Sequence, residues 1–232
     1  MTYILSIFLI LTLTANIYAN PLDDNCPTFV LGKYPVVAAT TKTEYVCHTR
    51  YGVAYDDSNK ITLYVATKVN PAMMNGKIVR GNDFKVDPLM DSKYAVKPSD
   101  YVGTPYDKGH LAEAELFTTD EVAMHESFYM SNMHPQLANF NRGIWKSLET
   151  YTHKLAARDT IYIISGTVYG PKSSTIGKSV TVPEYSWKII QIPSSQTTEA
   201  YLIPNVQHDK IDAFKKYKVS VKEIEVATGL KF

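Results

Sequence analysis

Residues 131–149, which read SNMHPQLANFNRGIWKSLE, change in the middle from a strand-like to a helix-like pattern. A short strand is predicted over residues 128–133, ahead of Pro135. From about residue 139 to residue 157 the apolar side chains recur at three- and four-residue steps, which predicts a helix with one buried face. This apolar stripe consists of Ile144, Leu148, Tyr151 and Leu155.

A polar row is predicted beside that stripe. Its members follow one another at four-residue steps and therefore share one side of the helix; they are Asn141, Trp145, Glu149 and His153. Such a row, starting at a helix N-terminus, can direct the positive end of the helix dipole toward a phosphate. On the helix alone, the alternative is that Asn139 or Asn141 is only an N-cap and that Glu149 is a solvated side chain.

Upstream, residues 106–111 read YDKGHL and bring an acid, a cation, a glycine and an imidazole within four positions. Phosphodiester hydrolysis uses such groups, because His110 can take a proton from water and Lys108 can balance charge that builds on the phosphate. Gly109 is expected to let the backbone turn tightly. Taken by itself, a histidine after a glycine is more often a packing or surface residue.

Taken together, the two segments resemble the DNA/RNA non-specific endonucleases of the ββα-metal (His-Me finger) superfamily. In that family a D-R-G-H motif is followed by an Asn that binds the metal, and then by a Glu two helical turns further on. The separations from His110 to Asn141 and from Asn141 to Glu149 match this arrangement. The fragments S-N-x-x-P-Q and W-x-x-L-E are also typical of the family.

The resemblance extends on both sides of these segments. Arg80 lies in RGNDFKVD, which is similar to the family's upstream R-x-x-x-F-x-x-D. VPEYSWK at residues 182–188 resembles its v-P-x-x-x-W-K strand, and EVATG at residues 225–229 resembles its closing E-x-x-T-G. The match runs from about residue 45 to residue 232. It implies an α+β fold in which helices flank a central antiparallel sheet.

The resemblance also implies a role for each site residue. Asn141 would be the only direct protein ligand of Mg²⁺ or Mn²⁺, which suits a hard cation that keeps most of its water. His110 would activate the attacking water, Glu149 would orient water around the metal, and Arg80 and Lys108 would hold the phosphate. Further substrate contacts are assigned to Asp107 and His153. The substrates would be DNA and RNA, and the products 5′-phosphorylated oligonucleotides.

Two positions depart from the family pattern. Lys108 stands where the family usually has Arg, so a planar two-pronged phosphate contact becomes a point charge. His153 also replaces an Arg that relatives commonly carry. Because histidine is largely neutral near pH 7 unless its surroundings raise its pKa, this contact is expected to be lost or to depend on pH.

The rest of the chain favours an antiparallel α+β class. Residues 44–55 and 61–69 are predicted to form a hairpin around the turn-forming cluster at residues 56–60. Residues 71–105 are broken by glycines and prolines into a long loop of the kind that is often functional. Further strands are expected over residues 160–169, 181–192 and 200–204, and a short helix over residues 211–217. The sequence shows no internal repeat.

The first nineteen residues and the two cysteines of the chain indicate export. Residues 1–19 carry no charge, and their apolar run is too short to span a bilayer, which predicts a signal peptide cleaved after Ala19. An uncleaved anchor is the alternative. The nuclease domain would then be residues 20–232, secreted or periplasmic and without stable membrane association. Cys26 and Cys47, the only cysteines, are expected to form a disulfide that contributes about 2 to 4 kcal/mol.

The net charge of +1 and a pI near 7.7 do not by themselves indicate a nucleic-acid ligand, so any phosphate-binding surface must be local. One alternative is a nucleic-acid-binding protein on the same fold, catalytically weakened by Lys108 and His153. Another is a phosphoesterase acting on nucleotides or phosphoproteins. The preference between DNA and RNA, the formation of a homodimer and the existence of an inhibitor protein stay open.

Overall fold

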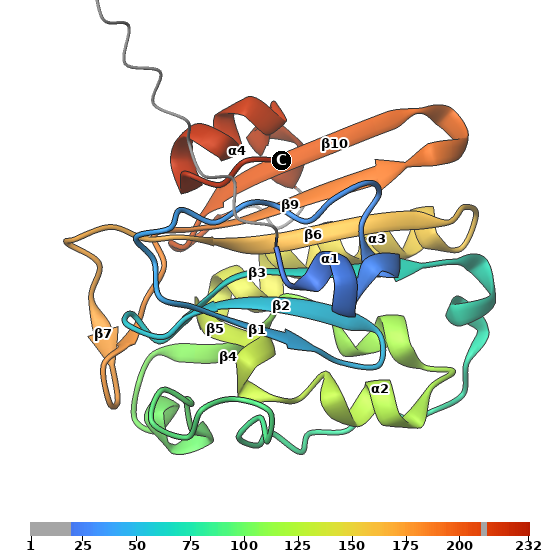
Figure 1. Cartoon of the computed structure of the whole chain (residues 1–232). Helices are drawn as coiled ribbons and strands as arrows, with labels where there is room; N and C mark the ends of the chain where they lie inside the picture. The colour runs from blue at the N-terminus through green and yellow to red at the C-terminus, as the bar shows by residue number, and fades with distance from the viewer. Residues whose placement is uncertain (1–19, 210–212) are drawn as a thin grey trace, which may run out of the picture.

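A seven-stranded antiparallel sheet forms the centre of the chain (Figure 1). The computed structural model describes residues 20–209 and 213–232, so the predicted signal peptide lies outside the described residues. Across the sheet the strands run β1 (Thr43–Cys47), β2 (Tyr51–Asp56), β3 (Ile61–Val69), β6 (Ile161–Val168), β9 (Tyr185–Ile192), β10 (Thr197–Pro204) and β11 (Lys218–Val219). The predicted α+β class is confirmed.

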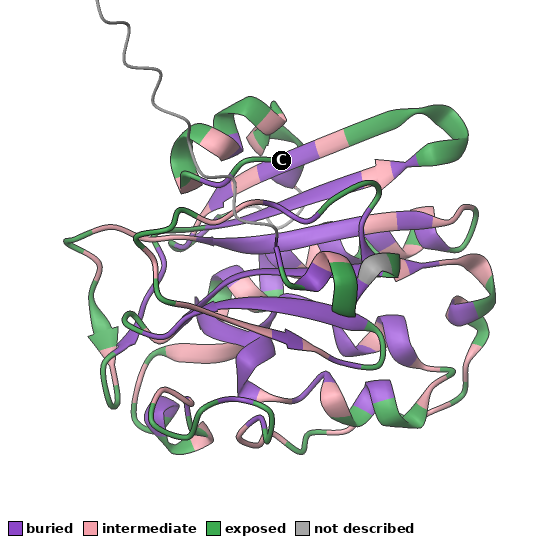
Figure 2. Cartoon of the chain, in the orientation of Figure 1, coloured by how far each residue is buried: buried purple, intermediate pink, exposed green. Residues whose placement is uncertain are grey.

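Both faces of this sheet are covered, which explains why its central strands are apolar on both sides (Figure 2). Val53 and Val65 belong to the larger core, together with buried residues of α2 (Glu121–Glu126) and α3 (Lys146–Ala156). Their neighbours Ala54 and Tyr64 face the opposite way. They pack in a second core with α1 (Leu22–Asn25) and α4 (Val221–Thr228).

The predicted hairpin is present, with one difference. The turn after β2 is fixed by Asp56, whose Oδ1 accepts hydrogen bonds from the backbone N–H groups of Ser58 (2.8 Å) and Asn59 (3.0 Å). Residues 44–55, however, are two strands rather than one. The chain reverses between His48 and Tyr51, so that β1 and β2 already form an antiparallel pair of their own.

The long irregular segment between β3 and β4 is confirmed; it holds only the short helical turns η2 (Pro71–Asn75) and η3 (Pro98–Tyr101). Its middle is tied to the sheet by the buried carboxylate of Asp87. His48 Nε2 lies 2.9 Å from this carboxylate, and the Ser131 hydroxyl donates to it. Burial raises the pKa of Asp87, but these partners outweigh it and lower the pKa. The loop is therefore anchored beside the β4–β5 pair.

A separate two-stranded sheet and the helix that follows form a ββα unit. β4 (Tyr106–His110) pairs with β5 (Met133–Leu137). The strand predicted over residues 128–133 is therefore wrong in position, because η5 (Met130–Asn132) precedes it as a helical turn. Pro135 lies inside β5, opposite Lys108. A two-stranded sheet tolerates a proline because the outer side of each strand carries no ladder hydrogen bonds.

The helix predicted over residues 139–157 begins with a widened, π-helical turn, η6 (Phe140–Trp145), and continues as α3. The backbone N–H of Lys146 donates to the carbonyl of Asn141, five residues back. This extra residue breaks the predicted polar row. Trp145 is fully buried in the core, while Lys146 takes its place on the polar side with Asn141 and Glu149.

The C-terminal part largely follows expectation. The predicted strand over residues 181–192 is divided: β7 (Thr175–Ile176) pairs with β8 (Val180–Thr181), and β9 begins after Pro183. Of the helix expected over residues 211–217, the described part is the short turn η8 (Ala213–Tyr217). α4 starts with a capping box of Ser220 and Glu223. Among residues 20–209 and 213–232, no helix is long and apolar enough to cross a membrane.

Cys26 and Cys47 form the predicted disulfide, with their Cα atoms 5.8 Å apart. The bond ties the segment after α1 to the end of β1. Protein isolated from an oxidising compartment is therefore expected to show no free thiol in denaturant and two after reduction. Replacing both cysteines by serine should lower the free energy of unfolding by about 3 kcal/mol, measured in urea. Two reactive thiols in the unreduced protein would contradict this pairing.

Candidate active site

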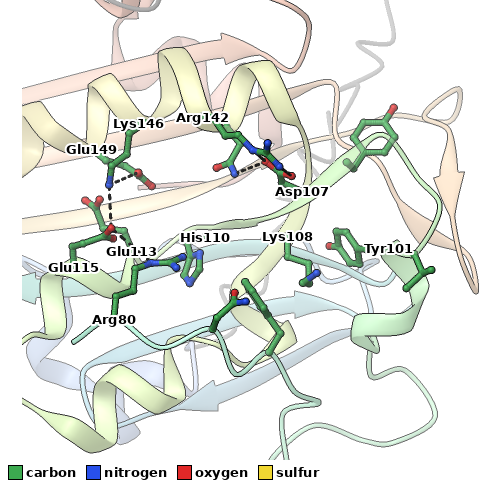
Figure 3. Close-up of a pocket in the computed structure, with 15 residues that line it drawn as sticks. Arg80, Tyr101, Asp107, Lys108, His110, Glu113, Glu115, Arg142, Lys146 and Glu149 are labelled. Atoms are coloured by element: carbon green, nitrogen blue, oxygen red, sulfur yellow. Dashed lines mark hydrogen bonds and ion pairs between the residues drawn. The ribbon is translucent and has the colours of Figure 1, made fainter. Parts of the chain in front are cut away.

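A pocket of about 570 Å³ opens between the ββα unit and the long loop (Figure 3). β4, the π-helical turn and α3 supply one wall, and residues 80–84 and 101–102 supply the other. The lining residues are Arg80, Asn82, Phe84, Tyr101, Val102, Tyr106, Asp107, Lys108, His110, Glu113, Glu115, Asn141, Arg142, Lys146 and Glu149. Every site residue expected from the sequence is among them except His153.

His110, at the end of β4, is almost fully buried between two phenylalanine rings. The ring centroids of Phe128 and Phe84 lie 5.1 Å and 5.8 Å from the imidazole. Nε2 is buried and has no hydrogen-bond partner among the described residues, so Nδ1 is the ring nitrogen left to face the pocket. Burial, followed by the positive charge of Arg80, lowers the pKa of His110 to about 3. The free site therefore holds a neutral imidazole near pH 7.

Gly109 does not provide the tight turn expected from the sequence. It lies within β4, paired with His134 on β5. A Cβ atom at this position would come within 2.1 Å of Gln136 Oε1. The glycine is therefore needed because the Gln136 side chain crosses β4 at this point, directly before the catalytic candidate.

The Asn141 amide is oriented by Asp107. Asn141 Nδ2 donates to Asp107 Oδ2 at 3.0 Å, and Arg142 holds the same carboxylate with two hydrogen bonds of 2.8 Å and 2.7 Å. Burial raises the pKa of Asp107, but Arg142 and Asn141 outweigh it, so the pKa is lowered. Since an ionised carboxylate only accepts hydrogen bonds, the amide nitrogen must face Asp107. Asn141 Oδ1 is thereby left for another partner.

Asp107 itself thus differs from its expected role in substrate binding. Its carboxylate is already occupied by Asn141 and Arg142, and its charge would repel a phosphate. It acts here as a positioning residue for the amide of Asn141. The N-cap alternative also fails, because Asn139 occupies the N-cap position without a side-chain cap hydrogen bond and Asn141 lies inside the helical turn.

Two cations face the middle of the pocket. The Arg80 guanidinium lies 5.1 Å from the Phe128 ring centroid, with Nε 3.7 Å from a Glu115 carboxylate oxygen. Lys108 Nζ lies 4.7 Å from the Phe84 ring centroid. Within residues 20–209 and 213–232, Lys108 forms no ion pair with a carboxylate. Its ammonium is therefore free to meet an anion.

The far end of the pocket is a cluster of charges around Lys146. Its Nζ lies 3.2 Å from a Glu115 oxygen and 3.7 Å from a Glu149 oxygen (Figure 3). Burial lowers the pKa of Lys146, but these carboxylates outweigh it and raise the pKa. Burial and the neighbouring Glu113 carboxylate raise the pKa of Glu149 well above its ordinary value. A cation bound in the pocket would favour the ionised form of Glu149.

His153 does not line the pocket, although it was expected to contact substrate. Its Nε2 lies 3.3 Å from Glu113 Oε2, and the Glu113 side chain is only 2% exposed. Burial lowers the pKa of His153, but the Glu113 carboxylate outweighs it and raises the pKa. The imidazole therefore balances a buried carboxylate behind the site rather than a phosphate in it.

Replacing His153 by arginine is expected to make stability less dependent on pH. With a raised folded-state pKa, the pair with Glu113 stabilises the fold fully below the ordinary histidine pKa of about 6.5, and this contribution is lost as pH rises through the raised value. Arginine stays charged throughout. The unfolding free energy of the variant relative to that of the parent should therefore be lowest near pH 6 and rise by about 1 to 2 kcal/mol toward about pH 9, measured by urea denaturation.

The matched control is His125→Arg, a histidine exposed on α2. It should leave the pH dependence of unfolding parallel to that of the parent. Parallel curves for His153→Arg as well would show that the ion pair with Glu113 does not stabilise the fold.

Comparison with known proteins decides the family. Residues 33–232 match the sequence profile described as DNA/RNA non-specific endonuclease. The chain belongs to the DNA/RNA non-specific endonuclease family. This match includes both the β4 segment and the helix that carries Asn141, so the expected family and ββα-metal fold are confirmed.

Members of this non-specific endonuclease family resemble the chain over most of its length. A nuclease of Nostoc sp. is 32% identical over 198 residues, which cover 79% of this chain and 70% of the relative. Human mitochondrial endonuclease G is 28% identical, covering 78% of this chain and 67% of its own; human mitochondrial nuclease EXOG is 29% identical, covering 83% and 57%. The chain thus spans about two thirds or less of these two human relatives.

A solved structure of a member supports the same fold. A chain from the crystal structure of an EndoG/EndoGI complex, described as showing the mechanism of EndoG inhibition, superposes with a TM-score of 0.76 at 26% identity. The superposition covers 81% of this chain and 84% of that chain.

The family is expected to use a divalent metal, and the residues present fit one. Asn141 Oδ1 is the free oxygen that Asp107 directs away from itself, and the Glu149 carboxyl lies in the same pocket. Neutral oxygen donors and carboxylates suit a hard cation such as Mg²⁺. In the described part of the chain, no group of three or more His, Cys, Asp or Glu side chains could hold a metal by themselves.

Several residues of this endonuclease site were missed in the sequence. Lys146 was missed because the widened turn, which moves it to the polar side, has no sequence signal. Glu113 and Glu115 lie beyond the end of β4, at the start of and within the short helical turn Ala114–Phe117, and no sequence pattern indicated that they reach the pocket. Arg142 could have been found, since it follows Asn141 directly and its charge matches that of Asp107.

Proposed function

We propose that this chain is a metal-dependent endonuclease that hydrolyses phosphodiester bonds of both DNA and RNA and leaves 5′-phosphorylated products. The observation that carries the proposal is the neutral imidazole of His110, which shares one pocket with Asn141 Oδ1 and the Lys108 ammonium, neither of them paired within the described part of the chain. Membership of the non-specific endonuclease family supports the substrate class.

In this proposal Arg80 and Lys108 bind the scissile phosphate from two sides. His110 takes the proton of the attacking water at Nδ1, while Nε2 carries the ring hydrogen. An anionic phosphate beside the ring neutralises the influence of Arg80 and so raises the imidazole pKa, which makes His110 a stronger base once substrate is bound. A Mg²⁺ ion held at Asn141 Oδ1 would supply stabilisation of negative charge in the transition state and on the leaving oxygen.

Two side chains prepare this arrangement. Asp107 holds the Asn141 amide in one orientation, which avoids an ordering cost when the cation binds. Glu149 would orient water at the far end of the pocket, where Lys146 fixes its carboxyl group.

We also propose that the chain is exported. The apolar leader at residues 1–19 supports this. The Cys26–Cys47 bond supports it too, because structural disulfides persist in oxidising compartments. Asn20, which would become the first residue after cleavage, has a buried side chain. Its Nδ2 donates to the Pro35 carbonyl at 2.9 Å and to the Tyr64 hydroxyl at 2.6 Å.

A plasmid-nicking assay tests the function. Supercoiled DNA and a structured RNA should both be cut in Mg²⁺ and left intact in EDTA. Retained binding without cutting in Mg²⁺ would favour the catalytically weakened binding protein instead. Cleavage of a nucleotide or phosphopeptide, with both polymers left intact, would favour the other phosphoesterase.

A further inference from the structure

His134 is a buried histidine behind the pocket that no step of the proposed mechanism uses. It lies on β5 opposite Gly109, and its surface is 0% exposed. It stands at one of the variable positions of the S-N-x-x-P-Q fragment, so membership of the family assigns it no role. Burying an imidazole costs desolvation that an apolar side chain of similar size would avoid. The hydrogen bonds of this ring therefore need an explanation.

The His134 imidazole connects the central sheet with the ββα unit. Ser186 Oγ, on β9 of the central sheet, lies 2.8 Å from His134 Nε2. Gln136 Nε2, on β5, donates a hydrogen bond to the same ring nitrogen at 3.0 Å. The indole of Trp145 packs edge-on against the imidazole, with the ring centroids 6.5 Å apart. The ring is thus held from β9 and from the helical turn, and it holds the Gln136 amide in turn.

This arrangement requires a neutral His134. The amide nitrogen of Gln136 can only donate, so His134 Nε2 accepts and the ring hydrogen lies on Nδ1. A protonated ring has no lone pair at Nε2 and would lose this bond. Burial, followed by the positive charge of His110, lowers the pKa of His134 to about 3. The bond to Gln136 therefore persists at neutral pH.

Gln136 carries the restraint from His134 to β4. A Cβ atom at Gly109 would lie 2.1 Å from Gln136 Oε1, so the amide packs directly on the glycine backbone. Lys108 and His110, on either side of Gly109, both line the pocket. Glycine has the widest conformational freedom of any residue. Without the packed amide, the backbone between these two site residues would be the least restrained part of β4.

We infer that His134 is a positioning residue, which holds the Gln136 amide against Gly109 and thereby fixes Lys108 and His110 relative to each other. This inference rests on the proposed endonuclease function, in which Lys108 binds the phosphate and His110 takes a proton from water. Proton transfer needs hydrogen-bond geometry, whereas an ammonium attracts a phosphate over a range of positions. Loss of His134 should therefore lower kcat far more than it changes KM.

Two amide substitutions at position 134 separate this role from a general need for a polar side chain. His134→Gln places its amide near the position of Nε2, where the oxygen can accept from Gln136. His134→Asn is shorter and places its amide near Nδ1, which has no hydrogen-bond partner among the described residues. The Asn variant should lose about 10- to 100-fold in kcat with little change in KM, and the Gln variant should recover most of this loss.

A milder variant removes the anchor of His134 on the central sheet. The Ser186 hydroxyl is buried and lies against His134 Nε2, so Ser186→Ala should lower kcat by about 2- to 10-fold, as expected for one hydrogen bond. Ser165→Ala is the matched control. This serine is also buried, on the neighbouring β6, and its hydroxyl has no hydrogen-bond partner in the described part of the chain. It should keep the parent kcat and KM.

Amide hydrogen exchange, followed by mass spectrometry without substrate, gives a readout that does not depend on turnover. In His134→Asn, exchange should become faster in β4 while β6 and β9 keep the parent rates, because the restraint that is lost is local. Equally faster exchange in all three strands would show a general loss of stability and would overturn the positioning role.

The outcomes separate this inference from the proposed function. Parent-like kcat in His134→Asn, or equal losses in the Asn and Gln variants, would overturn the role of His134 while leaving the endonuclease intact. If the His134 variants do not fold, parent-like kcat in Ser186→Ala would overturn it. Absence of cleavage by the parent in Mg²⁺ would instead contradict the proposed function, and exchange in β4 would then decide whether His134 restrains that strand.

Discussion

Replacing His110 by alanine is expected to lower the rate of phosphodiester cleavage by about two to four orders of magnitude, which is the usual contribution of a positioned general base. Arg80 and Lys108 still face the pocket in this variant, so DNA binding should survive. Steady-state cleavage of a labelled oligonucleotide, together with anisotropy in EDTA, measures both quantities. Partial recovery of activity by added imidazole would assign the missing function to the ring.

The pH dependence of the parent provides a second measurement on the same residue. Because the pKa of His110 is about 3 in the free site, kcat/KM should not fall through the ordinary histidine range between about pH 7 and about pH 5. Bound phosphate raises this pKa, so the acidic limb of kcat should lie at higher pH than that of kcat/KM. Parent-like cleavage by His110→Ala would remove the proposed mechanism altogether.

Replacing Asn141 by alanine is expected to abolish Mg²⁺-dependent cleavage while leaving the fold intact. The side chain is half-buried at the pocket wall, and its only hydrogen bond described is the one to Asp107. Its loss removes the oxygen that would hold the cation without leaving a cavity in the core. Urea denaturation should therefore match the parent, while calorimetric titration with Mg²⁺ or Mn²⁺ should lose its signal.

A second substitution at this position separates charge from geometry. Asn141→Asp introduces a better ligand for a hard cation, but the new carboxylate would lie about 3 Å from the carboxylate of Asp107 and the two would repel each other. Cleavage should be restored only poorly, and Asp107→Asn in the same chain should improve it. Asn75→Ala, at an exposed asparagine on η2, is the control and should behave like the parent. Normal activity of Asn141→Ala would show that the cation is held elsewhere.

The sequence was sufficient to predict that His110, Asn141 and Glu149 share the pocket, because all three belong to one local ββα unit. It did not predict β4 as a strand, since its residues are polar and lack the alternation that identifies a half-buried strand. It did not reveal that burial lowers the pKa of His110, because Phe84 and Phe128 come from a loop and a segment that only the tertiary fold brings together.

Position 153 illustrates a different limit. The comparison with the family arginine predicted a substrate contact, whereas the side chain reaches Glu113, a residue outside every motif considered. The partner of a charged residue depends on how different elements pack together. The spacing of residues along one helix cannot predict that packing. The signal peptide remains a prediction, since it falls outside the described residues.

The widened turn at the start of the helix makes the number of residues between Asn141 and Glu149 a constraint on this enzyme in its own right. Each residue advances an α-helix by about 100°, so deleting one residue between Asn141 and Lys146 would rotate everything before the deletion by that angle relative to Glu149. The amide and the carboxyl group would then point to different sides. Substitutions in this segment leave that phase unchanged, but insertions and deletions change the phase of the whole site.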